Sequence, residues 1–368
     1  LELPNWWYVM SHEELRNPLA AYRGGRAVAQ KWRAPRTHLH AEMVKKRRDP
    51  TKSPKVELEE ALRALQAGDQ EAVERLMRRE HETPVPEDWQ RRYCDEARAY
   101  WDQFYRERTI NFFKDRHYLR EEFGELMPPD VLADPKRWMD ELPTVATGLT
   151  ELPMEVVETK TVLLELGCAV GNGLIPMLRA NPDLFGIGCD LSAEAVRLLC
   201  SKEEYRCGRC LAFPSDITKG SGEQPTSEHR SLEEQLPAHC VDFATLLFVL
   251  SAIDPAQYPQ TLRRIYGRLK PGGMVLVRDY GRGDLAQLRF GQGHWMGGDC
   301  YVRGDGTLAV FLTDTGLREI FEAAGFEMLS CEVRRTEVTN RGTGVVMPRV
   351  WVQGRFRRPE PRGLAPKK

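Results

Sequence analysis

The pattern of hydrophobic positions changes near residue 160. Beyond that point, short apolar runs of strand length alternate with segments whose apolar residues recur every three to four positions, as on one face of a helix. The runs lack the polar alternation of half-exposed strands, which is typical of parallel strands buried on both faces. The pattern therefore predicts a mainly parallel sheet covered by helices, with strands at 161–166, 184–189, 209–213, 241–247 and 274–278.

The last hundred residues are richer in strands. A hairpin is predicted at 301–313, with its turn at Asp305-Gly306. A helix at 314–324 and two strands at 326–334 and 349–356 follow it. These strands predict an antiparallel edge on the parallel sheet.

The first 160 residues divide differently. Residues 1–55 mix basic and aromatic residues with prolines, and we expect them to be extended or weakly ordered. Amphipathic helices follow at 56–80, broken at Gly68, then at 89–108 and up to about Met127. We divide the chain into a basic and helical N-terminal extension (1–80), a helical segment (81–155), an α/β catalytic domain (156–357) and a disordered basic tail (358–368).

Net charge and cysteine content limit the binding partners, the metal sites and the compartment that we expect. The formal net charge of −1 indicates no general attraction to polyanions, so only local basic runs such as 45–48 are relevant. That run fits phosphate contact, a solvated patch or a nuclear-import signal. The nine cysteines are too irregular for a disulfide scaffold, which favours a reducing compartment. Cys207 and Cys210 form one CxxC without a second pair, so we expect ordinary thiols and no metal.

No run approaches the roughly 20 apolar residues of a membrane span, so we expect no membrane partner. We expect a cytoplasmic location, and the sequence leaves the nucleus and the mitochondrion open.

A glycine-rich loop carries the sharpest chemical signal. The run Glu165-Leu-Gly167-Cys-Ala169-Val-Gly171-Asn-Gly173 follows a strand and opens a helix, as a nucleotide-binding loop must. Asp190 ends the next strand, 25 residues after Glu165, where a carboxylate accepts hydrogen bonds from ribose hydroxyls. Asp216 follows the third strand, where a carboxylate accepts from an adenine amine.

A nicotinamide-dependent dehydrogenase would more often carry glycine at position 169. The run Leu269-Lys-Pro-Gly-Gly-Met274 and the run Cys189-Asp190-Leu-Ser192 resemble class I methyltransferases instead. This resemblance implies a Rossmann-like, doubly wound sheet and S-adenosyl-L-methionine as cofactor.

Longer stretches resemble one family, the tRNA N3-methylcytidine methyltransferases that act on cytidine 32 of the anticodon loop. The resemblance covers about residues 89–357. It rests on Asn111-Phe112-Phe113-Lys114-Asp115-Arg116-His117, Leu247-Phe248-Val249-Leu250-Ser251-Ala252, Arg278-Asp279-Tyr280-Gly281, Tyr301-Val302-Arg303-x-Asp305-Gly306-Thr307 and Pro348-Arg349-Val350.

The resemblance implies a set of cofactor contacts. Segment 81–155 becomes a tRNA-binding and lid segment. The family usually has glycine where Ala169 stands, and an alanine methyl is tolerated there only at negative φ. The implied contacts are Trp101 and Tyr105 closing over the cofactor, Gly167 at its methionine part, Asp190 at the ribose, and Asp216, the Ile217 backbone and Leu247 at the adenine.

Methylation of cytosine N3 places few demands on a catalyst. The N3 lone pair is free at neutral pH, so the enzyme mainly aligns N3, methyl and sulfur. The base must be unpaired and splayed out. Because the product base is positively charged, a nearby carboxylate stabilises the transition state.

Some candidates for these roles also have a structural alternative: Phe112 and Phe113 in the core, Arg116 in an ion pair, His117 as a structural histidine and Asp279 as a helix cap. Asp279 and Asp115 are the candidate carboxylates. Stacking on the base is assigned to Phe112, Phe113 or Tyr280, and contacts to phosphates or to the cytosine carbonyl are assigned to Lys114, Arg116, His117 and Arg303.

The expected partner is tRNA, bound through its anticodon stem-loop. An aminoacyl-tRNA synthetase or another tRNA-binding protein stays open as a second partner. Two other functions also stay open: a methyltransferase acting on a protein or a small molecule, and a non-catalytic tRNA-binding subunit whose cofactor loop is weakened at Ala169.

Overall fold

The computed structural model describes residues 54–80, 83–108, 114–133, 149–339 and 344–361. The basic segment before residue 54, with its run at 45–48, lies outside the described residues. So do Phe112, Phe113 and residues 362–368 of the tail.

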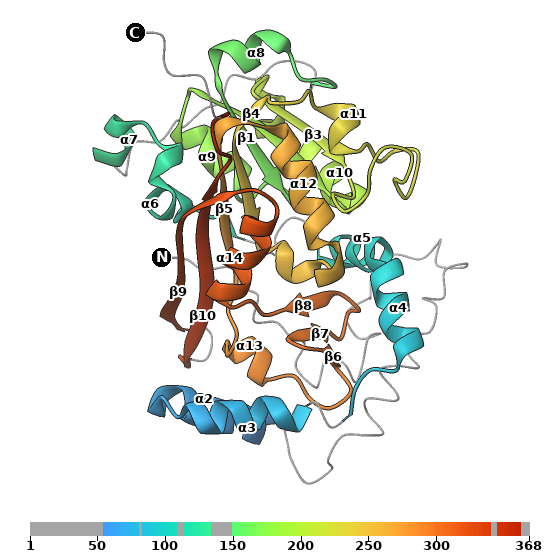
Figure 1. Cartoon of the computed structure of the whole chain (residues 1–368), viewed down its shortest axis with the longest axis vertical. Coiled ribbons are helices and arrows are strands. Elements are labelled where there is room, and N and C mark those ends of the chain that lie inside the picture. The colour runs from blue at the N-terminus through green and yellow to red at the C-terminus, as the bar shows by residue number, and fades with distance from the viewer. Residues whose placement is uncertain (1–53, 81–82, 109–113, 134–148, 340–343, 362–368) are drawn as a thin grey trace, which may run out of the picture.

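A seven-stranded sheet forms the centre of the fold, in the order β3-β2-β1-β4-β5-β10-β9 (Figure 1). The first five of these strands are parallel, and β10 pairs antiparallel with both β5 and β9. This confirms the predicted doubly wound sheet with an antiparallel edge. The strands are β1 (Thr161–Leu166), β2 (Leu184–Asp190), β3 (Cys210–Pro214), β4 (Val241–Leu247), β5 (Leu269–Tyr280), β9 (Glu327–Thr339) and β10 (Val346–Arg357).

The five parallel strands are largely apolar and are buried on both faces, whereas the edge strand β9 is mostly exposed. Successive residues of β1 point to opposite sides. Leu164 packs in the cluster with Ile265 of α12, and Leu163 packs in the cluster with Leu174 of α9. No helix in the described ranges is long and apolar enough to cross a membrane. The helices of this domain are α8 (Met154–Thr159), α9 (Leu174–Ala180), α10 (Ala193–Cys200), α11 (Leu232–Gln235), α12 (Tyr258–Arg268), α13 (Leu285–Leu288) and α14 (Asp314–Ala323).

The predicted hairpin at 301–313 is part of a second, three-stranded sheet. Strands β7 (Cys300–Val302) and β8 (Leu308–Val310) pair antiparallel across the turn at Asp305-Gly306. A third strand, β6 (Trp295–Gly297), pairs with β7. Three residues are too few to show an alternating pattern, so the sequence did not indicate β6.

The single helix expected at 89–108 is two helices, α4 (Glu87–Asp95) and α5 (Ala97–Arg108). Glu96 interrupts them, with φ −96° and ψ 11°. Its carboxylate accepts from the guanidinium of Arg92 at 3.0 Å. The helical stretch near Met127 is likewise broken, into α6 (Leu119–Glu122) and the short 3-10 helix η1 (Gly124–Leu126), followed by α7 (Pro129–Ala133).

The described part of the N-terminal extension is a helical hairpin of α2 (Pro54–Ala67) and α3 (Gln70–Glu80). The predicted break at Gly68 is confirmed, with φ +66°. Figure 1 shows the hairpin beside α13. Apolar residues of both helices pack there against Leu285, Leu288 and Met347. Arg282 adds a two-pronged contact to Glu74, at 2.6 and 3.1 Å.

One buried ion pair joins strand β10 to the segment after β5. The Arg349 guanidinium donates to both oxygens of Asp284, at 2.9 and 3.1 Å, and both side chains are almost fully buried. Asp284 also accepts from the amide of Val350 at 2.7 Å. Such geometry holds β10 and α13 together in a water-excluded interior.

Removal of the Asp284 carboxylate should destabilise the fold strongly. Asp284→Ala leaves a buried guanidinium without this anion, which costs about 3–5 kcal/mol. The exposed pair of Arg357 and Glu327 is the matched control, because Glu327→Ala should cost less than about 1 kcal/mol. Urea unfolding of both variants measures the difference. Equal losses would contradict the assigned role of the buried pair.

Candidate active site

A cavity of about 980 Å³ lies at the carboxyl ends of β1 to β4, under the helices α4 and α5. Both β2 and β4 flank β1, so the cavity sits where the strand order reverses, the usual ligand position in such sheets. All seven residues expected to contact a cofactor line it: Trp101, Tyr105, Gly167, Asp190, Asp216, Ile217 and Leu247. Their roles stay a prediction, since position alone does not show contact.

Two glycines of the loop after β1 are required by space. Gly167 has φ +66°, and a Cβ there would lie 2.5 Å from the side chain of Val249. A Cβ at Gly173 would lie 2.1 Å from the Glu165 carboxylate. Glu165 is thus packed directly beneath the loop, where burial raises its pKa to about 7, opposed by the charge of Arg116. Gly167 and Ala169 of this loop line the cavity.

Asp190 holds the loop and the next turn together. Its Oδ2 accepts from the amide of Ala169 at 2.8 Å, and its Oδ1 accepts from the amide of Ser192 at 2.9 Å. Burial raises the pKa of this carboxyl to about 6, against the effect of the two amides. A carboxylate oxygen has two lone-pair sites, so Asp190 retains capacity for two ribose hydroxyls.

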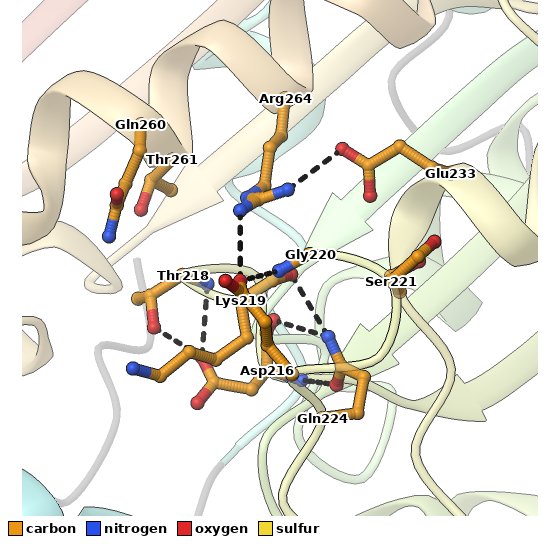
Figure 2. A network of polar contacts seen from close by, with 12 residues as sticks. Asp216, Thr218, Lys219, Gly220, Ser221, Gln224, Glu233, Gln260, Thr261 and Arg264 are labelled. Atoms are coloured by element: carbon orange, nitrogen blue, oxygen red, sulfur yellow. Dashed lines mark hydrogen bonds and ion pairs between the residues drawn. The ribbon is translucent and has the colours of Figure 1, made fainter.

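The segment after β3 is fixed by a polar network (Figure 2). Asp216 Oδ1 accepts from the amide and hydroxyl of Thr218, at 3.0 and 2.6 Å. The side-chain amide of Gln224 bonds to the Asp216 backbone in both directions. Arg264 of α12 reaches over the segment to Glu233 at 3.1 Å. This network presents the Asp216 side chain and the Ile217 backbone at one edge of the cavity.

The helix α5 forms the cavity's cover through its aromatic side chains. Trp101 and Tyr105 stack with ring centroids 6.1 Å apart, and Phe104 contacts both edge-on. Phe104 and Tyr105 pack in one hydrophobic cluster with Ala169 and Val170. The cover is therefore continuous with the glycine-rich loop.

Sequence reasoning missed Phe248, which lines the cavity at the end of β4. Its φ of +63° is a strained backbone for a bulky residue, and such strain is concentrated at functional sites. The ring packs on Tyr280 and Trp351, at 5.3 and 5.0 Å, and the Arg116 guanidinium lies 5.5 Å from its centre. The residue type carries no such signal, because the strain exists only in the folded backbone.

Neither candidate carboxylate is among the residues that line the cavity, and a catalytic role for either stays a prediction. Asp279 is completely buried, and its oxygens accept from the amides of Ser251 and Tyr280, at 3.0 and 2.8 Å. It therefore holds the 3-10 helix η3 (Leu250–Ala252), as its alternative role as a cap predicts. Asp115 is exposed and accepts from Asn172 at 3.0 Å.

The remaining candidates divide between the cavity and its surroundings. Arg116 lines the cavity, with its Nη1 4.0 Å from Glu165 and 3.4 Å from the carbonyl of Leu247. Tyr280 is buried in the same core cluster as Phe248, and its assignment to base stacking stays a prediction. Lys114, His117 and Arg303 are not among the residues that line the cavity, and Phe112 and Phe113 lie outside the described residues.

The condition set for Ala169 is not met. Its φ is +51°, so an alanine occupies the left-handed conformation that favours glycine. Elsewhere, Cys207 and Cys210 are buried among apolar residues, and no cluster of three or more metal-ligating side chains occurs in the described ranges.

Residues 134–331 match a family model described as a methyltransferase domain. The tRNA N(3)-cytidine methyltransferase METTL2 of Danio rerio is 39% identical over 287 residues, which are 76% of this chain and 78% of that protein. METTL6 of Mus musculus, also named a tRNA N(3)-cytidine methyltransferase, is 38% identical over 74% of this chain and 84% of its own. A solved SAM-dependent methyltransferase of Methanosarcina mazei aligns over 58% of this chain and its whole length at TM-score 0.38 and 16% identity.

Relief of the strain at position 169 should stabilise the protein. Ala169→Gly removes a Cβ from a left-handed residue, which should raise the free energy of unfolding by about 0.5–1 kcal/mol. Ala99→Gly, at an exposed position inside α5, should lower it by about 1 kcal/mol. Thermal unfolding of the pair measures both signs. A loss in both variants would show that the positive φ at Ala169 carries no strain.

The raised pKa of Asp190 sets a pH dependence for binding. Asp190 is the expected ribose ligand, and an ionised carboxylate accepts better from hydroxyls, so we expect binding to prefer the deprotonated form. S-adenosylmethionine affinity should therefore be constant above the pKa of about 6 and fall by up to about tenfold per pH unit below it. Calorimetric titration between pH 5 and 8 measures the profile. Asp190→Asn should bind the cofactor weakly and show no fall in affinity below pH 6. A fall that persists in this variant would assign the titration to another group.

Proposed function

The chain belongs to the tRNA N3-cytidine methyltransferase family, and on this premise we propose that it methylates N3 of cytidine 32 in the anticodon loop of tRNA, with S-adenosylmethionine as methyl donor. The observation that carries the proposal is the cavity in which all seven expected cofactor contacts meet. The relatives' names support tRNA and the N3 atom. The position in the anticodon loop rests on the resemblance alone.

The residues present fit the cofactor. Gly167 lines the cavity, and its lack of a side chain lets the loop backbone approach the methionine part closely. Asp190 retains acceptor capacity for the ribose, and Asp216 with the Ile217 backbone faces the adenine end. When bound, S-adenosylmethionine supplies an electrophilic methyl group on its sulfonium sulfur. The chain's own residues need only bind it, cover it with α5 and present the base in line.

The end of β4 is the place for the base. Phe248 offers an aromatic ring there, and Arg116 beside it carries donors that suit the cytosine carbonyl. Arg116 is held from behind by Glu165 and by the carbonyl of Leu247. Because N3 has a free lone pair, orientation of the ring by these two residues replaces a general base. An aromatic face also stabilises the positive charge of the product.

Partners beyond tRNA are part of the proposal. The anticodon stem-loop is the element to be bound, and its bases must be splayed out for N3 to reach the cavity. An aminoacyl-tRNA synthetase or another tRNA-binding protein is the second partner that the family resemblance leaves open. Its need is decided by adding it to the assay below.

Methyl transfer from labelled S-adenosylmethionine to tRNA tests the proposal. Wild type should form N3-methylcytidine in tRNA transcripts with C32, mapped by the stop that this base causes in reverse transcription. Transcripts with U32 should stay unlabelled. Asp190→Ala should lose the product, and Phe248→Leu should lower the rate with little change in cofactor affinity.

Three results would contradict the proposal, and each points to a different alternative. Label on the U32 transcript would place the target elsewhere in tRNA. Cofactor binding without transfer to any tRNA, with or without an added synthetase, would point to another substrate. Absence of cofactor binding by wild type would favour a non-catalytic tRNA-binding subunit.

A further inference from the structure

Asp102 is a buried carboxylate in the middle of the covering helix α5, and the function proposed above does not use it. Only 5% of the residue is exposed. Its Oδ1 accepts the hydroxyl proton of Ser192 at 2.7 Å and lies 3.5 Å from the amide of Glu194. Its Oδ2 contacts the Arg98 guanidinium, one helical turn earlier, at 3.0 Å.

These contacts reach the cofactor site through one shared residue. Ser192 donates its hydroxyl to Asp102 and its backbone amide to Asp190, the expected ribose ligand. The same Ser192 caps α10 by accepting from the amide of Ala195 at 3.2 Å. The helix above the cavity and the turn below it are therefore joined at Ser192.

The position of Asp102 in α5 connects this contact to two aromatic residues of the cover. Trp101 precedes it and Tyr105 follows one turn later, and both line the cavity. Residues three apart lie on neighbouring positions of a helical surface. When Asp102 is bound to Ser192, its two aromatic neighbours are held over the cavity.

We propose that Asp102 is the positioning residue that latches α5 onto the ribose-binding turn and so holds the cover closed over the cofactor. The proposal rests on the cofactor site proposed above. A hydrogen bond to a carboxylate is about twice as strong as a neutral one. Closure of the cover and cofactor binding are coupled, because each favours the same arrangement of α5 and the turn.

Three variants test the latch. Asp102→Ala removes the acceptor, whereas Asp102→Asn keeps one oxygen for Ser192 and loses the charge and the second acceptor oxygen that pairs with Arg98. Ser192→Ala removes the donor from the other side. Gln103→Ala, at a half-buried neighbour whose amide contacts Glu107, is the matched control.

Two measurements separate positioning from general stability. Titration calorimetry gives S-adenosylmethionine affinity, and hydrogen exchange of residues 97–108 reports opening of α5 with no cofactor present. Asp102→Ala and Ser192→Ala should each weaken binding by about tenfold and speed exchange in α5. The turnover number at saturating cofactor should change less than twofold. Asp102→Asn should recover most of the affinity, the double variant should be no worse than either single one, and Gln103→Ala should match wild type.

The proposal is overturned if Asp102→Ala binds the cofactor and exchanges in α5 as wild type does. It is equally overturned if Asp102→Asn is as impaired as Asp102→Ala, or if the effects of Asp102→Ala and Ser192→Ala add in full. If Asp102→Ala does not fold, Asp102→Asn and Ser192→Ala with their double variant decide. A wild type that fails to bind the cofactor refutes the proposed function, while exchange in α5 still tests the latch.

Discussion

The Asp190 carboxylate binds two backbone amides, one from the glycine-rich loop and one from the turn before α10. The rest of the site depends on this buried group. It fixes the separation of the two segments that border the cavity, and through Ser192 it connects with the covering helix α5. An isolated carboxylate in such an environment prefers to be neutral. The two amides and the site's polar edge keep it available as an acceptor.

Backbone strain marks the same region. Ala169 and Phe248 have positive φ values, and both line the cavity from adjacent strands, β1 and β4. A left-handed conformation is costly for residues with a Cβ and persists only where the surroundings enforce it. At Ala169 the loop must turn beneath α5. At Phe248 the ring packs on Tyr280 and Trp351 beside the cavity, at the end of β4. The two strained residues therefore lie at positions that shape the cavity.

Periodicity predicted the sheet because its parallel strands are buried on both faces and its helices are amphipathic. The glycine-rich loop and the acids at strand ends were recognisable because their chemistry follows from residue type and position. The roles of Asp279, Asp102 and Phe248 depend on which atoms fold beside them. Asp279 has the sequence context of a catalytic acid, yet it binds the amides of Ser251 and Tyr280 instead. Asp102 and Ser192 are 90 residues apart, and no local pattern indicates their contact.

The most direct test is a crystal structure of the protein with S-adenosylhomocysteine. The account predicts the ribose hydroxyls within hydrogen-bonding distance of Asp190, the adenine amine at Asp216, and the sulfur facing Phe248 at the end of β4. Density for the ligand outside this cavity, or a ribose turned away from Asp190, would contradict the account.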